Sequence, residues 1–144
     1  MIPLLLAADH AGFALKEILK PFLKKRGLIV HDLTPTFVAG DDYPPIAKKT
    51  ARLVAKEKNG QAILLCGSGY GMDIAANRVK GVRAIVARTI EDAFLARRDD
   101  HSNILVLGGR ITKPTLAKKI LQTWLSTPYS RIPRYGRRVK QIDR

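Results

Sequence analysis

The stretch LLCGSGYGMDIAANR, residues 64–78, joins the end of an apolar run to three alternating glycines and then to a helical pattern. The apolar residues up to Cys66 predict a buried strand, and MDIAANRV predicts a helix after the glycines. Glycines let the backbone approach a ligand closely, and the first N–H groups of a helix lack partners, so this turn is a candidate anion site. A purely steric role stays an alternative, because the spacing G-x-G-x-G matches neither the P-loop nor the dinucleotide fingerprint.

The same alternation of apolar strand and helical pattern runs through most of the chain. We expect strands at residues 2–8, 28–32, 61–66, 82–87 and 103–109. We expect helices at residues 12–27, 44–60, 72–79, 89–100 and 112–126, and a short helix after Pro133. Pro21 lies inside the first helical pattern and is expected to kink or shorten that helix. The alternation predicts an α/β fold, a single Rossmann-like three-layer αβα domain with a five-stranded parallel sheet in the order 2-1-3-4-5.

Length and charge narrow the classes of protein and partner. The 144 residues fit one domain, with a core at 1–126 and a basic C-terminal tail at 127–144. The net charge of +14 is concentrated from Arg110 onward, which indicates an anionic partner such as RNA, a membrane face or a phosphorylated small molecule. A solvated basic surface is the alternative interpretation. No stretch approaches the ~20 apolar residues that cross a membrane, and the lone cysteine fits a reducing cytosol.

The expected sheet places the ligand site outside the carboxyl ends of strands 1 and 3, where the strand order reverses. These two strands end at ADH, residues 8–10, and at CGSGYG, residues 66–71. Cys66 is then either a reactive thiol at the start of a helix or a buried structural thiol. Asp9 is a candidate ligand of hydroxyl groups, a candidate N-cap of the first helix, or both.

The tail carries a second candidate group. Arg134 and Arg138 are four residues apart, so in a helix they share one face and can clamp a phosphate between two guanidinium groups. A basic surface helix is the alternative interpretation of the same spacing.

Six motifs, in this order along the chain, resemble the ribose-5-phosphate isomerase B family, which includes the galactose-6-phosphate isomerase subunits. The motifs are AADHAGF (7–13), DYP (42–44), CGSGYGMDIAANR (66–78), GVRA (81–84), NILVLGGR (103–110) and RYGRR (134–138). The resemblance implies a cytosolic, Rossmann-like homodimer, or a tetramer, whose active sites are built from two subunits, with the tail packed on the partner. It also implies interconversion of aldose and ketose phosphates without metal or organic cofactor.

The resemblance also implies roles for individual residues. Cys66 matches the base that moves a proton between C1 and C2 through an enediolate, and Ser68 matches a hydroxyl beside it. The backbone amides from Gly67 through Gly69 to Gly71 match the anion hole of that enediolate. The other matched positions bind substrate: Asp9 the sugar hydroxyls, Tyr43 the pocket wall, and His10, Arg134 and Arg138 the phosphate, with Arg110 adding to them.

One segment departs from the family's pattern. The family reads His-Asn-Asp-Ala-Asn before strand 5, and that histidine opens the sugar ring, whereas this chain reads DDHSN at residues 99–103. Asp99 could act as the acid if burial or Asp100 raised its pKa, and His101 could substitute in a remodelled turn. Asp100 is expected to bind substrate. The third alternative is a substrate that needs no ring opening, such as a tetrose 4-phosphate.

The leading hypothesis is therefore an isomerase of ribose 5-phosphate and ribulose 5-phosphate, with Cys66 as the base. Isomerisation of a tetrulose, allose or galactose phosphate is the second hypothesis, and an inactive paralogue is a third. A basic nucleic-acid-binding module ranks below both enzyme hypotheses, because the sequence has neither a binding motif nor interleaved aromatic residues. No membrane partner is expected.

Overall fold

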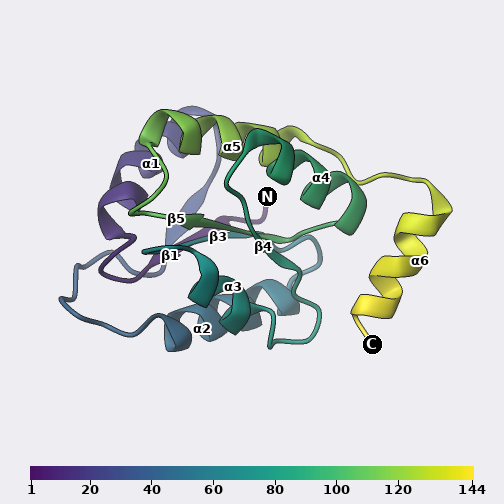
Figure 1. Ribbon diagram of the computed structural model, residues 1–144, viewed down its shortest axis with the longest axis horizontal. Helices are drawn as coiled ribbons and strands as arrows, with labels where there is room; N and C mark the ends of the chain where they lie inside the picture. Colours follow the sequence, from purple (N-terminus) through teal and green to yellow (C-terminus); the bar gives the residue numbers. More distant parts are fainter.

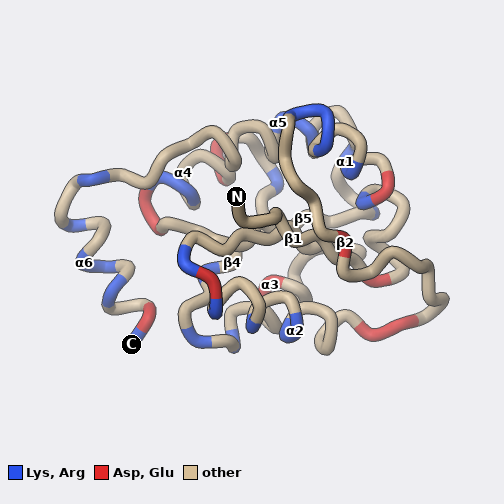
Figure 2. Tube along the Cα trace, turned by 180° about the vertical axis from the view of Figure 1, so that it is seen from behind, with Lys and Arg blue, Asp and Glu red and all other residues tan.

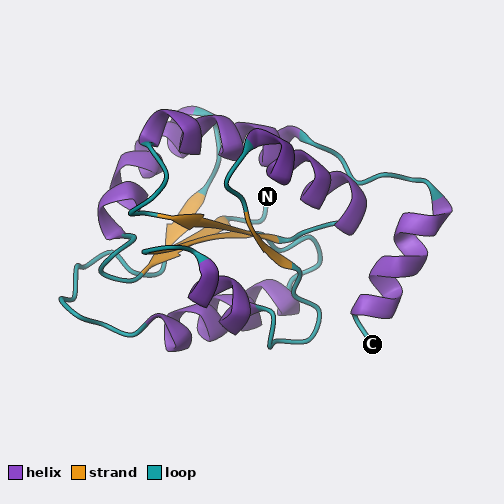
Figure 3. Cartoon of the chain, in the orientation of Figure 1, coloured by secondary structure: helices purple, strands orange, loops and turns teal.

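The computed structural model describes residues 1–144. It contains five strands and six helices, which alternate along the chain except that two helices follow the last strand (Figure 3). The strands are β1 Leu4–Ala8, β2 Val30–Asp32, β3 Ala62–Cys66, β4 Ala84–Val86 and β5 Ile104–Gly108. The helices are α1 Phe13–Lys25, α2 Tyr43–Lys56, α3 Tyr70–Ala76, α4 Ile90–Asp100, α5 Pro114–Ser126 and α6 Pro133–Ile142. The α/β class and the helix in the tail are confirmed. None of the helices combines the length and the apolar character needed to span a bilayer.

The sheet is the middle of three layers, with α1, α4 and α5 over one face and α2 and α3 over the other (Figure 1). Because successive residues of a strand point to opposite faces, β3 contributes to both layers of the core. Ile63 and Leu65 pack with the first helix group, and Leu64 and Cys66 with the second. All five residues of β3 are buried, as expected for a parallel strand covered on both sides.

The strands are all parallel, but their order is β2-β1-β3-β5-β4, so the predicted order 2-1-3-4-5 is wrong for the last two strands. Burial explains the exchange. Every residue of β5 is buried and β5 pairs with β3 along its whole length, whereas the three residues of β4 are only partly buried. The long apolar strand therefore gains more from the central place, and the short strand forms the edge. The predicted switch point between β1 and β3 is unaffected.

Two local features complete the fold. The helix α1 continues through Pro21 to Lys25, so the prediction that this proline shortens the helix is wrong. Leu15, Leu19 and Leu23 are buried along its inner face, and Pro21 lies on the exposed side. At the sheet edge, the side-chain amide of Asn77 donates to the carbonyl oxygen of Ala84 at 2.9 Å and accepts from its N–H at 2.8 Å. Asn77 thus provides hydrogen-bond partners for the main-chain groups of the first residue of β4.

The tail helix α6 stands apart from the three layers, beside the end of α4 (Figures 1 and 2). Its only buried residue is Val139. Basic residues occur along its length, as the blue segments of Figure 2 show. A helix that buries so little apolar surface gains little stability from packing on its own chain. A contact outside this chain would stabilise it further.

Candidate active site

The candidate site lies at the carboxyl edge of the sheet, where the turns after β1, β3 and β5 meet. These strands are neighbours in the sheet, so Asp9 and Gly109, which follow β1 and β5, come from the same edge as Cys66, the last residue of β3. An open cleft of about 420 Å³ lies over the three turns. Its lining is Asp9, His10, Ala11, Tyr43, Cys66, Gly67, Ser68, Gly71, Arg110 and Ile111. The cleft lies at the predicted switch point. It brings Cys66 together with seven other residues that the sequence analysis assigns to the site.

Cys66 forms the floor of the cleft. Its side chain is 4% exposed, and its Sγ accepts a hydrogen bond from the backbone N–H of Gly69 at 3.2 Å. Gly69 has φ of +88°, and a Cβ atom there would come within 2.7 Å of the Val86 side chain. Only glycine fits this left-handed, crowded position, so the turn can wrap around the sulfur. The Gly69 amide points at the atom that would carry negative charge in a thiolate.

The glycine turn also makes room for an aromatic wall. Tyr43, the first residue of α2, packs its ring directly over Gly71, and a Cβ atom at Gly71 would overlap that ring. The hydroxyl of Ser68 accepts from the Tyr70 N–H at 3.3 Å and stays beside Cys66 at the cleft surface. The turn therefore brings a hydroxyl and an aromatic ring into the lining of the cleft that also holds the thiol.

Asp9 shapes the turn after β1. Its buried carboxylate accepts from the N–H groups of Ala11 and Gly12, both at 3.0 Å. The helix α1 begins at Phe13 with Gly12 as its N-cap, so the prediction that Asp9 is the N-cap is wrong. Asp9 instead closes the turn that precedes the helix, and its second oxygen is available to the cleft.

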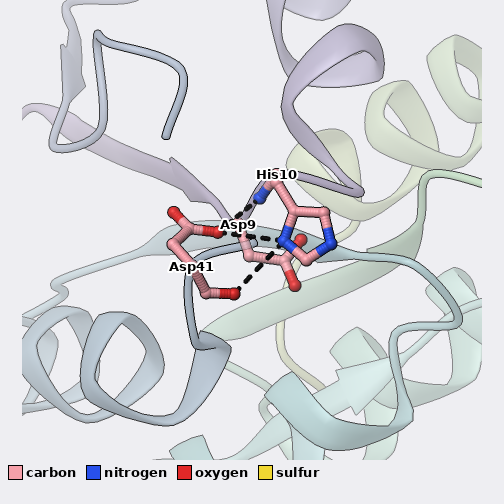
Figure 4. Close-up of side chains that lie close together, drawn as sticks. All are labelled: Asp9, His10 and Asp41. Atoms are coloured by element: carbon pink, nitrogen blue, oxygen red, sulfur yellow. Dashed lines mark hydrogen bonds and ion pairs between the residues drawn. The ribbon is translucent and has the colours of Figure 1, made fainter. Parts of the chain in front are cut away.

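His10 follows Asp9 and contacts Asp41, which comes from the loop between β2 and α2 (Figure 4). One ligand atom each of Asp9, His10 and Asp41 lie within 4.8 Å of one another, the spacing at which such groups can bind a metal ion. The Asp9 carboxylate already accepts two amide hydrogen bonds, and His10 Nδ1 lies 3.1 Å from Asp41 Oδ1. The donor set therefore fits a hydrogen-bonded network better than a metal site.

Arg110 supplies positive charge to the lining of the cleft, beside Gly67. Its backbone N–H donates to the Gly67 carbonyl at 3.0 Å, and its exposed guanidinium lies against Gly67. Arg110 and His10 are thus the two cleft residues that can attract a phosphate group.

The remaining predicted residues lie at the opposite edge of the sheet. α4 ends at Asp100 just before β5 begins, and α6 lies beside α4. A five-residue strand spans on the order of 15 Å, so Asp99, Asp100, Arg134 and Arg138 cannot reach the cleft of their own chain. Figure 1 shows α6 on the side of the molecule away from the loop between β2 and α2.

Asp99 is held as a carboxylate. The Arg98 guanidinium donates to both of its oxygens, at 2.6 and 3.2 Å. This hydrogen bonding lowers the pKa of Asp99 below its ordinary value, and the charges of Arg98, Arg134 and Arg138 lower that pKa further. The hypothesis that burial or Asp100 raises the pKa of Asp99 is therefore wrong, and Asp99 belongs to a cluster with the two tail arginines.

His101 occupies the C-cap of α4 in a left-handed conformation, with φ of 51°. Its ring stacks on Tyr129 with the ring centroids 4.3 Å apart, and its buried Nε2 has no hydrogen-bond partner. Burial lowers the pKa of His101, and the charges of Arg83 and Arg97 act in the same direction. The imidazole therefore stays neutral in the folded protein near pH 7 and does not face the Cys66 cleft.

We expect the neutral His101 to make stability depend on pH. Its folded pKa is below the unfolded value of about 6.5, so the unfolded chain binds more protons and the free energy of unfolding falls as pH drops from about 7.5 to 5.5. His101→Asn removes the titration and suits the left-handed conformation. Urea unfolding should show that the free energy of unfolding falls less over this pH range for His101→Asn than for the wild type. Equal losses would contradict the assignment.

Sequence patterns missed Asp41, which lies in a segment of Thr, Pro, Gly and Asp with no periodicity. The only local signal is its place directly before the DYP motif, and nothing in the pattern indicates that its partner is His10. The contact exists because the loop from residue 33 to 42 folds back over the carboxyl edge.

Comparison with known proteins places this geometry in a family context. The family described as Ribose/Galactose Isomerase matches residues 4–142. Ribose-5-phosphate isomerase B of Escherichia coli is 37% identical over 93% of this chain and 89% of its own. D-erythrulose-4-phosphate isomerase of Pectobacterium atrosepticum is 35% identical over 90% of this chain and 86% of its own.

A solved structure shows the same fold. Ribose-5-phosphate isomerase B of Mycoplasma genitalium, with bound ribulose 5-phosphate, superposes with a TM-score of 0.92 at 38% identity. The match covers 98% of this chain and 93% of that one.

Proposed function

The chain belongs to the ribose/galactose isomerase family and is a sugar-phosphate isomerase, and we propose that its reaction is the interconversion of ribose 5-phosphate and ribulose 5-phosphate. The observation that carries this proposal is the cleft itself. It groups a thiol, an amide directed at that thiol, a carboxylate, an imidazole and a guanidinium around one space. These are a base, donors for an enediolate and ligands for a phosphorylated polyol.

In the proposed mechanism, Cys66 acts as a thiolate base. It takes the proton from C2 of the open-chain aldose, and the electrons move toward the C1 carbonyl to form an enediolate. The Gly67–Gly71 amides stabilise the negative oxygens, because preorganised donors favour charge that develops in the transition state. The same sulfur returns the proton to C1, and Ser68 passes a proton between the two oxygens. Asp9 binds the sugar hydroxyls and Tyr43 bounds the pocket.

The phosphate needs more charge than one cleft supplies. His10 and Arg110 are the cleft's cationic candidates, whereas Arg134 and Arg138 lie at the opposite edge of the same chain. We propose that a second copy places its α6 over the cleft, so that its two arginines and Asp99 complete the site. The helices α3 and α4 both contact β4 and carry exposed apolar residues that offer a surface for that copy, namely Tyr70, Ile74, Phe94 and Leu95.

A second candidate substrate is favoured by Asp99. An ionised carboxylate paired with Arg98 cannot donate a proton to open a furanose ring. A four-carbon sugar phosphate has its ring-closing hydroxyl blocked by the phosphate, so its isomerisation needs no such acid. The relative from Pectobacterium atrosepticum carries erythrulose 4-phosphate in its name, which makes this substrate a specific alternative.

A panel of four-, five- and six-carbon aldose and ketose phosphates tests both candidates. We expect the wild-type protein to interconvert ribose 5-phosphate and ribulose 5-phosphate. In the Asp99→His variant, the turnover rate of the five-carbon substrate should rise relative to that of the four-carbon one, because histidine at this position can act as the acid that opens the sugar ring. Turnover of erythrulose 4-phosphate alone would replace the first candidate by the second. No turnover of any member would overturn the proposed reaction.

A further inference from the structure

We propose that Asp41 is a positioning residue that fixes the orientation of His10 and keeps hydrogen on Nδ1, so that Nε2 is the ring nitrogen offered to the substrate, as an acceptor when the ring is neutral and as a donor to the phosphate when both nitrogens carry hydrogen. The phosphate role of His10 rests on the proposed function. The tautomer does not, because it follows from contacts within the chain.

Asp41 holds His10 at three points (Figure 4). Its Oδ1 accepts from the backbone N–H of His10 at 2.7 Å. The ring Nδ1 lies 3.1 Å from the same Oδ1 and 3.2 Å from the main-chain oxygen of Asp41. These contacts constrain both the backbone and the ring of one residue, which a single contact cannot do.

The partners determine where the hydrogen lies. Both atoms facing Nδ1 are oxygens that accept hydrogen bonds, so Nδ1 carries the hydrogen. Nε2 is then the nitrogen left for a ligand in the cleft. It accepts from a hydroxyl when the ring is neutral, and when both nitrogens carry hydrogen the ring bridges Asp41 and a phosphate oxygen.

The loop that carries Asp41 is also anchored at its other end. Thr34 accepts from the Ala8 N–H through Oγ1 at 2.9 Å, directly before the Asp9–His10 turn. The fully buried Lys16 donates to the Thr34 carbonyl at 2.5 Å and to Asp32 at 2.7 Å. The loop is therefore tied to the end of β1 on both sides.

Between its anchors, the loop has an aromatic contact. Phe37 packs edge-on against Phe13, with the ring centroids 5.5 Å apart. Because this contact is separate from the His10 contacts, Phe37→Ala is a matched control that loosens the loop and leaves the Asp41 carboxylate in place.

The first test measures the tautomer without substrate. The ¹⁵N shifts of the His10 ring, identified by their absence in His10→Asn, should show hydrogen on Nδ1 in the wild type, in Phe37→Ala and in Asp41→Asn. Asparagine keeps an acceptor oxygen at the same place. Asp41→Ala removes Oδ1 and leaves only the main-chain oxygen 3.2 Å from Nδ1, so it should weaken this preference. Titration with inorganic phosphate should then shift Nε2 less than in the wild type.

The second test separates binding from chemistry. Asp41→Ala should raise KM for ribose 5-phosphate about tenfold with kcat changed less than about threefold, and Asp41→Asn should restore most of the loss. An unchanged tautomer and KM in Asp41→Ala would overturn the proposal. An equal rise of KM in Phe37→Ala would overturn it as well. A wild-type protein inactive on every sugar phosphate would overturn the proposed function alone, since the ring shifts still decide the role of Asp41.

Discussion

Replacing Cys66 with alanine is expected to lower kcat for ribose 5-phosphate by about a thousandfold or more, because the cleft holds no second base at the position of Sγ. The sulfur lies on the floor of the cleft with the Gly69 amide directed at it, so a water molecule at this site would lack both the position and the basicity of a thiolate. The measurement is the initial rate at saturating substrate, followed by the formation of the ketose.

The loss must be separated from unfolding. Cys66→Ala leaves a small void and an unpaired Gly69 amide, which together cost about 1 to 2 kcal/mol of unfolding free energy. Thr50→Ala is a suitable control, because Thr50 is fully buried in α2 and its hydroxyl donates to the Ile46 carbonyl at 2.9 Å, outside the cleft. We expect the control to lose comparable stability and to keep its activity. Full activity of a folded Cys66→Ala would exclude the thiol as the base.

Two inactive variants should restore activity when they form mixed dimers. Cys66→Ala disables the carboxyl edge of the sheet, and the double variant Arg134→Ala/Arg138→Ala disables the cluster at the opposite edge. If each site combines one edge from each subunit, a mixed dimer has one intact site. Random mixing makes half of the dimers mixed, so refolding the two variants together should recover about a quarter of wild-type activity at limiting substrate.

The matched control pairs two changes at the same edge. Cys66→Ala mixed with Asp9→Ala should stay inactive, because both residues come from one chain in every site, and no combination of subunits restores a complete set. Recovery in this control, or none in the first mixture, would contradict the composite site.

Most of the cleft was predictable from sequence because its residues sit in short turns directly after apolar strands. Parallel strands bring their carboxyl ends to one edge, so Asp9 and His10 on one turn and Cys66 on another were expected to be neighbours. The two edges of the sheet could be told apart in the same way, since Asp99 precedes a strand and Cys66 ends one. The lowered pKa of Asp99 was not predictable, because it depends first on the hydrogen bonds from the Arg98 side chain, whose direction no local pattern shows, and then on the charges of Arg134 and Arg138, which α6 brings alongside.

The sequence by itself determined the α/β class, the five strands and the turns that carry the chemistry, since apolar periodicity and glycine spacing are local properties of the chain. Only the tertiary structure decided that β5 takes the central place and β4 the edge, because that choice depends on total buried area. It also decided that Asp41 holds His10, a contact made by an aperiodic loop anchored at both ends. Such contacts follow from how the whole chain packs, and no local pattern encodes them.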